Sequence, residues 1–240
     1  MNHPRSLTLP TLLILLVVSG AACSPSHRTR AATPATTTPA PALPETIELA
    51  TPNIATLTLV DQPDSTQIVA TRETAPPGSA RVFPILERRN GWARLQVPGP
   101  AGATPTGWVR TVELTVGNTP YRILVEISAR RATLLDHGHP VATSGAAVGT
   151  PATPTPAGTY FVTDLLQPPD PNTVYGAYAY GLSGFAAQGP QGEGQLGLHG
   201  TNDPATLGQA VSAGCVRVDD AFLRRVVDVL PLGAPVTIRP

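Results

Sequence analysis

The sequence predicts a mainly β protein, built from two β-rich parts and a single amphipathic helix near the C-terminus. The 28 prolines and 22 glycines of the chain interrupt long helices and suit turns between short strands. Short or alternating apolar runs, such as residues 54–60 and 121–127, have the pattern of strands. Helical spacing of apolar residues is clear only after Arg217, at Phe222, Leu223, Val226, Val227 and Leu230.

The composition limits the classes of function. The 16 basic residues, all of them Arg, equal the 16 acidic ones, so the formal net charge is zero. A nucleic-acid-binding protein usually carries an excess of positive charge, and we exclude nucleic acid as a partner on this ground. With 240 residues, the chain has room for one or two domains behind its N-terminal stretch.

The N-terminus has the layout of a secretory signal, which we assign to residues 1–22. Residues 7–18 are mostly apolar, too few to cross a bilayer as a helix but sufficient for the core of a signal peptide. The following Ser19-Gly20-Ala21-Ala22-Cys23 resembles a bacterial lipoprotein signal, which implies lipidation of Cys23, although Gly20 stands where Leu is commonest. The alternative is an ordinary signal peptide cleaved near Ala22. Both predict the cell envelope, either the outer face of the cytoplasmic membrane through a lipid anchor or secretion.

Residues 23–46 are rich in Thr, Pro and Ala without apolar periodicity, which predicts a semi-extended, disordered linker. Residues 47–116 then read as a first β domain, with a hairpin turn at Asn90-Gly91. Its Gly-Trp-x-Arg pieces at Trp92 and Trp108 resemble those of bacterial SH3-like domains. The two tryptophans either line a peptide groove or anchor the core of a small barrel, as Trp often does.

Residues 117–240 form the second predicted domain. Strands at 131–136 and 140–143 flank a polar turn and give a hairpin. Residues 164–180 read as a loop, whose Tyr175, Tyr178 and Tyr180 either form a lid over the site or pack against the sheet, and residues 181–185 as a turn. Asp219 or Asp220 is positioned to cap the helix, which ends at Pro231 and Gly233 before a closing strand at 235–238.

A histidine and a cysteine are the candidate reactive pair. Cys215 follows His199 by sixteen residues, with Gly200 and Gly214 beside them. A neighbouring base activates a thiol, and glycines let a backbone approach a substrate and present N–H groups to an oxyanion. The alternative is a buried, inert cysteine and a core or turn histidine. If Cys23 is acylated, Cys215 has no partner for a disulfide and remains a free thiol.

The residues around His199 and Cys215 favour the interpretation that the pair is reactive. The run His199-Gly-Thr-Asn with Ser212-Ala-Gly-Cys-Val-Arg217 resembles the signature of the L,D-transpeptidase catalytic domain. The resemblance continues in Val148-Gly149, followed by Thr155-Pro-x-Gly-x-Tyr160, and covers about residues 121–238. The domain would be a β-rich fold that carries no cofactor and no metal. His137 and His139 lack the ligand set of a zinc site.

The resemblance also implies a reaction and its residues. Cys215 would attack an amide of a peptidoglycan stem tetrapeptide, release D-Ala, and pass the acyl group from a thioester to an amine of another stem. His199 would be the base, the carbonyl of Gly200 would orient its ring, and the N–H groups of Gly214 and Cys215 would form the oxyanion hole. Carbapenems would be inhibitors of such an enzyme.

Substrate contacts are expected at Ser212, Arg217 and Tyr175, although Arg217 could instead serve in a structural ion pair. Ala213 departs from the family pattern, in which a histidine is common at this position. Two other functions stay open. One is a non-catalytic wall-binding or scaffolding lipoprotein, and the other is an L,D-carboxypeptidase in which water accepts the acyl group.

Overall fold

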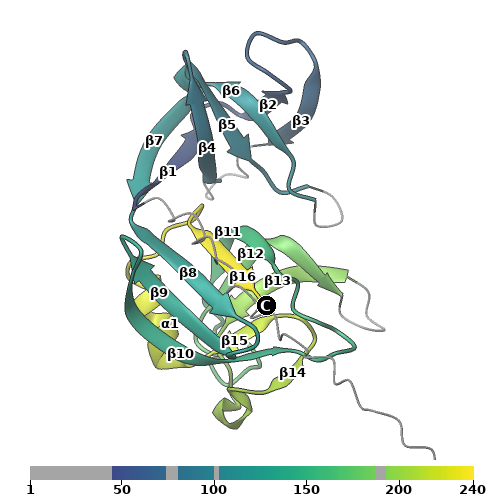
Figure 1. Cartoon of the computed structure of the whole chain (residues 1–240), viewed down its shortest axis with the longest axis vertical. Helices are drawn as coiled ribbons and strands as arrows, with labels where there is room; N and C mark the ends of the chain where they lie inside the picture. The colour runs from purple at the N-terminus through teal and green to yellow at the C-terminus, as the bar shows by residue number, and fades with distance from the viewer. Residues whose placement is uncertain (1–44, 74–80, 100–102, 188–192) are drawn as a thin grey trace, which may run out of the picture. The chain divides into compact units, whose positions relative to one another are not determined.

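The computed structural model describes residues 45–73, 81–99, 103–187 and 193–240, and it is mainly β with one short α-helix near the C-terminus, as predicted. The described strands form two sheets (Figure 1). The predicted signal peptide, Cys23 and nearly all of the predicted linker lie outside the described residues. No helix within the described ranges has the length and apolar character needed to cross a membrane.

The first sheet is antiparallel, in the order β3-β2-β6-β5-β4-β1-β7. Its elements are β1 (Ile47–Pro52), β2 (Thr56–Val60), β3 (Ile68–Glu73), β4 (Phe83–Arg89), β5 (Trp92–Gln96), β6 (Thr106–Arg110), the 3-10 turn η2 (Thr111–Glu113) and β7 (Leu114–Thr119). The β4–β5 hairpin turns at Asn90-Gly91, where both residues have positive φ, as this dipeptide favours. Because β7 runs to Thr119, the first sheet ends slightly beyond the boundary predicted at residue 116.

The two tryptophans of the first sheet are anchors of its packing. Trp92 and Trp108 are almost fully buried and cluster with Val60. Arg110 and Arg89 stack on their rings, at 4.6 and 5.1 Å from the ring centroids. This burial fits the core-anchor alternative and leaves neither indole free to line a groove.

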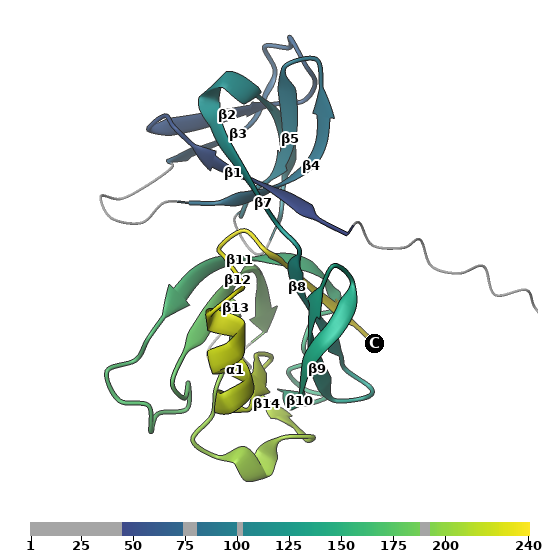
Figure 2. The same cartoon turned by 90° about the vertical axis from the view of Figure 1, so that its left-hand side faces the viewer.

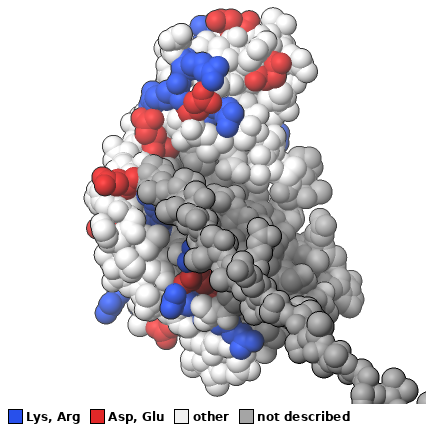
Figure 3. All heavy atoms as spheres, viewed as in Figure 1, with Lys and Arg blue, Asp and Glu red and all other residues white. Residues whose placement is uncertain are grey.

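Charged side chains of the first sheet pair with neighbours of opposite sign. Arg88 lies 2.8 Å from Glu48, and Arg89 lies 2.6 Å from Glu87. Blue and red side chains accordingly lie close together on the face shown in Figure 3. These exposed pairs contribute little to stability, because water and salt screen them.

The second sheet contains nine strands in the order β14-β10-β15-β13-β12-β11-β16-β8-β9, and an additional β9–β10 pairing closes eight of them into a barrel. The elements are β8 (Tyr121–Glu126), β9 (Arg131–Asp136), β10 (His139–Gly149), β11 (Gly158–Leu166), β12 (Ala179–Ala187), β13 (Glu193–His199), the 3-10 turn η4 (Pro204–Thr206), β14 (Ala210–Ser212), β15 (Val216–Val218), α1 (Asp220–Val227) and β16 (Pro235–Arg239). The β9–β10 hairpin turns through His137 and Gly138, both at positive φ, as the sequence predicts.

Helix α1 completes the core of this barrel (Figure 2). Asp219 is its N-cap, and its carboxylate accepts from the N–H groups of Ala221 and Phe222 at 2.8 and 3.2 Å. Phe222, Leu223 and Val226 are buried against apolar strand residues. The predicted helix and its cap are therefore confirmed, but the helix ends at Val227, before the end expected at Pro231, and Leu230 lies beyond it. The chain leaves β15 through this cap directly after Val218.

One predicted turn is a strand. Residues 181–185 lie inside β12, which pairs with β11 and β13. The glycines that suggested a turn instead make room for neighbouring side chains. A Cβ on Gly184 would collide with the ring of Tyr160, and one on Gly181 would meet Gln195. Packing between neighbouring side chains, rather than turn chemistry, explains both glycines.

Candidate active site

His199 and Cys215 are brought together by two adjacent parallel strands. His199 is the last residue of β13, and Cys215 directly precedes β15. Leu198 pairs with Val216, and His199 pairs with Arg217. Paired strands lie about 4.8 Å apart, and this register puts Cys215 opposite Gly197, two residues before His199, so the side chains of Cys215 and His199 lie diagonally on the same face of the pair. The pairing of these two strands therefore determines the separation of His199 and Cys215.

Gly197 leaves the space between the thiol and the imidazole open. A Cβ placed on Gly197 would lie 3.4 Å from the sulfur of Cys215 and 3.5 Å from Cδ2 of His199. Sulfur and ring carbon are thus less than about 7 Å apart. No hydrogen bond joins the two side chains in the described structure, and catalytic hydrogen bonds often tighten only when substrate binds.

The imidazole is held in one tautomer. Its Nδ1 lies 2.7 Å from the carbonyl oxygen of Gly200, the contact expected from the sequence. Because a carbonyl oxygen can only accept, Nδ1 carries the proton and Nε2 keeps a lone pair. Glycine is required at position 200, since a Cβ there would collide with the carboxylate of Asp220. The ring is therefore oriented to accept a proton at Nε2.

Burial keeps the ring of His199 neutral. Desolvation lowers its pKa to about 4, and the charge of Arg217 acts in the same direction. The carbonyls of Gly200 and Val174 and the carboxylate of Asp220 favour the protonated ring without reversing the shift. At neutral pH the imidazole is thus unprotonated, as a general base must be.

Burial also keeps the thiol of Cys215 protonated. Desolvation raises its pKa, while the backbone N–H of Gly197 and the charge of Arg217 lower it less strongly. Cys215 is a free, partly buried cysteine. The site therefore holds a neutral thiol near a neutral imidazole.

The backbone before Cys215 is fixed by hydroxyl groups. Ser212 donates to the carbonyl of Cys215 at 2.6 Å and accepts from the N–H of Gly214 at 3.1 Å. The sequence suggested that Ser212 binds substrate, but its buried hydroxyl is engaged within the loop. The N–H of Gly214, expected in the oxyanion hole, is occupied by Ser212, which leaves the N–H of Cys215 as the candidate donor.

Thr155 is a residue of the site for which the sequence suggested no role. Its buried hydroxyl donates to the carbonyl of Gly214 at 2.8 Å and accepts from the N–H of Gly149 at 2.8 Å. The Thr155-Pro-x-Gly motif is apparent in the sequence, but Gly214, the partner of the Thr155 hydroxyl, lies 59 residues further along the chain.

Among the three tyrosines, Tyr175 alone stands over the site. Its half-exposed ring meets the imidazole of His199 edge to face, with centroids 5.1 Å apart. Tyr178 packs against the barrel core beneath Arg224. Tyr180 is fully buried and donates to the carbonyl of Leu230 at 3.1 Å. The lid alternative thus fits Tyr175, and the packing alternative fits the other two.

Asp220 anchors the loop that carries Tyr175. Its Oδ2 accepts from the N–H of Ala177 at 3.2 Å, while its buried Oδ1 has no hydrogen-bond partner within the described ranges. Gly176 has a positive φ of 65°, and a Cβ there would collide with the same carboxylate. The first residue of α1 is therefore packed against both the loop and Gly200.

Arg217, which is paired with His199 across the two strands, has no partner carboxylate among the described residues. Over the described parts of the chain, no acidic side chain lies within 4.0 Å of its guanidinium, and its buried Nε has no hydrogen-bond partner. The structural ion pair considered from the sequence is absent there, and the guanidinium is free to meet an anionic group.

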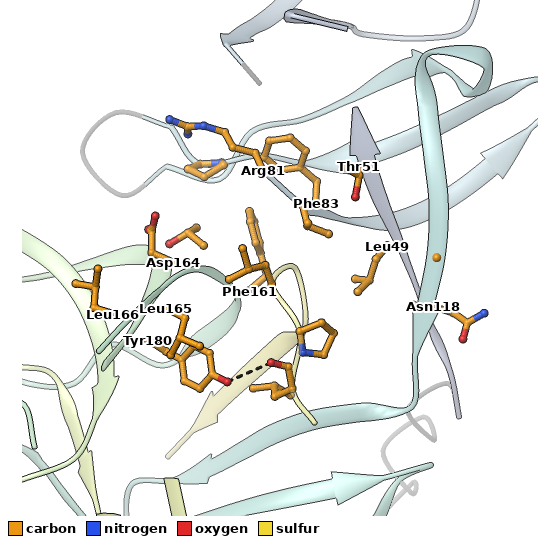
Figure 4. Close-up of a pocket in the computed structure, with 17 residues that line it drawn as sticks. Leu49, Thr51, Arg81, Phe83, Asn118, Phe161, Asp164, Leu165, Leu166 and Tyr180 are labelled. Atoms are coloured by element: carbon orange, nitrogen blue, oxygen red, sulfur yellow. Dashed lines mark hydrogen bonds between the residues drawn. The ribbon is translucent and has the colours of Figure 1, made fainter. Parts of the chain in front are cut away.

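A separate cavity lies away from this pair. It has a volume of about 850 Å³, and its lining includes Phe161, Leu165 and Tyr180 (Figure 4). Figure 4 also shows the bond from the Tyr180 hydroxyl to the carbonyl of Leu230. Neither His199 nor Cys215 lines this cavity. This cavity is therefore not the site of the thiol.

About half of this chain is similar to a known protein family. The family model of the YkuD L,D-transpeptidase catalytic domain matches residues 120–238. The YkuD protein of Bacillus licheniformis, named for an L,D-transpeptidase, is 34% identical over 121 residues, which is 50% of this chain and 67% of that protein. Its namesake in Bacillus subtilis is 34% identical over 119 residues, 50% of this chain and 66% of that protein. The matches thus span about two thirds of each relative.

Parts of this chain are also similar to solved structures. An L,D-transpeptidase from Mycobacterium tuberculosis aligns at 16% identity over 79% of this chain and 81% of that chain, with a TM-score of 0.44. The Bd1075 protein of Bdellovibrio bacteriovorus aligns at 24% identity over 50% of this chain and 48% of that chain, with a TM-score of 0.41. From the family model and the curated relatives, the chain belongs to the YkuD L,D-transpeptidase family, and residues 120–238 form its catalytic domain.

Proposed function

We propose that this protein is a peptidoglycan L,D-transpeptidase, which forms cell-wall crosslinks through a thioester on Cys215. One observation carries the proposal. The neutral imidazole of His199 is bonded at Nδ1 to the carbonyl of Gly200, and Gly197 leaves open the space between this ring and the thiol. Membership in the YkuD family supports the same reaction.

The first half-reaction consumes a stem tetrapeptide. Nε2 of His199 takes the thiol proton while the sulfur of Cys215 attacks the carbonyl carbon of the amide before the terminal D-Ala. The electron pair of the carbonyl moves to its oxygen, which the N–H of Cys215 meets. When the carbonyl re-forms, the C–N bond breaks, and the departing amine of D-Ala takes the proton from His199. A thioester on Cys215 remains.

The second half-reaction transfers the acyl group. The side-chain amine of another stem attacks the thioester carbonyl and gives its proton to His199, and the sulfur leaves and is reprotonated. An attack by water would instead give an L,D-carboxypeptidase. Both outcomes use the same base and the same nucleophile, so the acceptor alone separates them.

Two further side chains are suited to hold the donor. The unpaired guanidinium of Arg217 matches the carboxylates of a stem peptide, since Arg binds carboxylates through two parallel hydrogen bonds. The ring of Tyr175 covers one face of His199 and would exclude water from it. Arg217 would thus select the charge of the donor, and Tyr175 would shield the base.

Mass spectrometry of the intact protein after incubation with a carbapenem, such as meropenem, tests the covalent step. The thiol should open the β-lactam by the same attack on a carbonyl carbon, which adds the mass of the whole inhibitor at Cys215. The adduct should be absent in Cys215→Ser and strongly reduced in His199→Ala. A folded wild-type protein that gains no mass would favour the scaffolding function.

Product analysis distinguishes transfer from hydrolysis. A tetrapeptide donor is incubated with and without an amine acceptor, and the products are separated by liquid chromatography. A crosslinked product that forms only with the acceptor supports transpeptidation. Release of a tripeptide at the same rate in both mixtures identifies the carboxypeptidase.

We also propose that Cys23 carries a lipid anchor on the outer face of the cytoplasmic membrane, and that residues 47–116 form an SH3-like module. The basis is the sequence around Cys23 and the Gly-Trp-x-Arg pieces. Metabolic labelling with a palmitate analogue should mark the wild-type protein but not Cys23→Ser. A label that persists in the variant would contradict the anchor, and equal secretion of both proteins without label would indicate an ordinary signal peptide.

A further inference from the structure

Thr155 lies at the loop that carries the nucleophile, although it comes from a distant part of the chain. Residues 150–155 follow β10 and pack on the residues between β14 and β15. Thr150 donates through its N–H, and Thr153 through its hydroxyl, to the carbonyl of Ser212 at 3.1 and 3.0 Å. Thr155 alone reaches the peptide unit that joins Gly214 to Cys215.

The hydroxyl of Thr155 can donate its hydrogen bond in only one direction. The oxygen accepts from the N–H of Gly149 at 2.8 Å, and the carbonyl of Gly214 lies 2.8 Å away and can only accept. A hydroxyl has a single hydrogen, so that hydrogen points to the carbonyl of Gly214. The side chain is buried, which excludes water as a competitor for this bond.

Fixing this carbonyl also fixes the N–H of Cys215. A trans peptide is planar, and its C=O and N–H point in opposite directions. With the carbonyl of Gly214 turned to Thr155, the N–H of Cys215 points away from Thr155. Gly214 has a φ of 120°, a conformation that glycine adopts freely, so its own backbone does little to prevent rotation of this peptide.

We propose that Thr155 is a positioning residue of the active site, whose hydroxyl holds the N–H of Cys215 in the direction needed to stabilise the oxyanion. The inference rests on the proposed function, because only an acyl-transfer reaction forms an oxyanion beside Cys215. The N–H of Gly214 is engaged by Ser212, so the N–H of Cys215 is the donor that depends on this restraint.

Two reactions of the same thiol separate positioning from general loop stability. Acylation by meropenem forms the S–C bond at a carbonyl carbon, and an oxyanion develops before the lactam C–N bond breaks. Alkylation by iodoacetamide forms an S–C bond while iodide leaves, without charge on a carbonyl oxygen. A displaced N–H should therefore slow acylation and leave alkylation unchanged.

The test compares Thr155→Val, Thr155→Ser and Thr153→Val with the wild-type protein. Valine keeps the shape and removes the hydroxyl, and we expect acylation to slow by about 10- to 100-fold, below the full loss of an oxyanion donor. Alkylation should stay within about twofold, since it needs no such donor. Serine should restore most of the acylation rate. Thr153→Val removes a bond to the same loop, at the carbonyl of Ser212, and should acylate like the wild-type protein.

Each other outcome has a defined meaning. Acylation at the wild-type rate in Thr155→Val overturns the inference and leaves the proposed function intact. Loss of both reactions together, or loss of the fold in a thermal melt, makes Thr155 a structural residue and overturns the inference as well. A wild-type protein that is alkylated but never acylated contradicts the proposed function, and the inference falls with it.

Discussion

The ring of Tyr175 meets the imidazole of His199 edge to face, 5.1 Å between centroids, while Nδ1 of the same imidazole donates to the carbonyl of Gly200. The candidate base is thus covered by an aromatic ring and a backbone carbonyl, neither of which carries a charge. This enclosure explains why desolvation dominates the pKa of His199.

The pKa of His199 predicts a loss of stability in acid. The folded protein holds this pKa at about 4, below the ordinary value of 6.5, so between these values the unfolded chain binds a proton that the folded chain rejects. Stability from this group is full above pH 6.5, falls as the pH drops through this window, and loses about 3 kcal/mol by pH 4. Urea unfolding of the wild-type protein and His199→Gln across this range checks it. Parallel curves would refute the prediction.

Replacing Asp220 by asparagine is expected to stabilise the folded protein. Its buried Oδ1 has no hydrogen-bond partner in the described ranges, while Oδ2 accepts from the N–H of Ala177. Asp220→Asn removes the charge and keeps the acceptor, and we expect about 1 kcal/mol of added stability, since buried unpaired charged groups are costly. Asp220→Ala leaves the N–H of Ala177 unpaired and should destabilise. Thermal melts at pH 7 in which both variants shift in the same direction would contradict this account.

Arg217 predicts a selective loss of donor binding. Because no carboxylate of the described chain pairs with it, Arg217→Gln breaks no ion pair and should leave the melting temperature nearly unchanged. The KM for a tetrapeptide donor should rise about tenfold or more, as expected for a lost charged hydrogen bond. Exposed Arg225→Gln is the matched control and should alter neither quantity. A large drop in melting temperature for Arg217→Gln alone would indicate a structural role.

The hydroxyl of Tyr180 is expected to stabilise the fold without taking part in the reaction. Its buried hydroxyl donates to the carbonyl of Leu230, so Tyr180→Phe should cost about 1 to 2 kcal/mol by leaving that buried carbonyl unpaired. Tyr178→Phe keeps the ring that Arg224 covers and should change stability by less than about 0.5 kcal/mol. Equal urea midpoints for the two variants would show that the Tyr180 hydroxyl contributes nothing.

Local chemistry made part of the fold predictable from the sequence. The turns at Asn90-Gly91 and at His137-Gly138 were visible because these residues tolerate positive φ. The helix was visible because Asp219 caps it and the apolar residues recur at helical spacing. The candidate residues His199 and Cys215 were recognisable from the sequence motifs around them.

Contacts between distant segments account for the rest. Residues 181–185 were expected to form a turn, because the sequence does not reveal that Tyr160 and Gln195 occupy the space above Gly184 and Gly181. Strand β15 is three residues long, too short for a periodic pattern, and its parallel pairing with β13 depends on the whole barrel. The hydroxyls of Ser212 and Thr155 could not be assigned, since their partners appear only once the loops pack.

The parallel pairing of β13 with β15 sets the spacing of Cys215 and His199 directly, whereas residues 201–209 follow β13 and bond to other segments, such as Asn202 to the carbonyl of Asn172. Changes in the length or sequence of residues 201–209 are therefore expected to leave the spacing of the cysteine and the histidine unchanged.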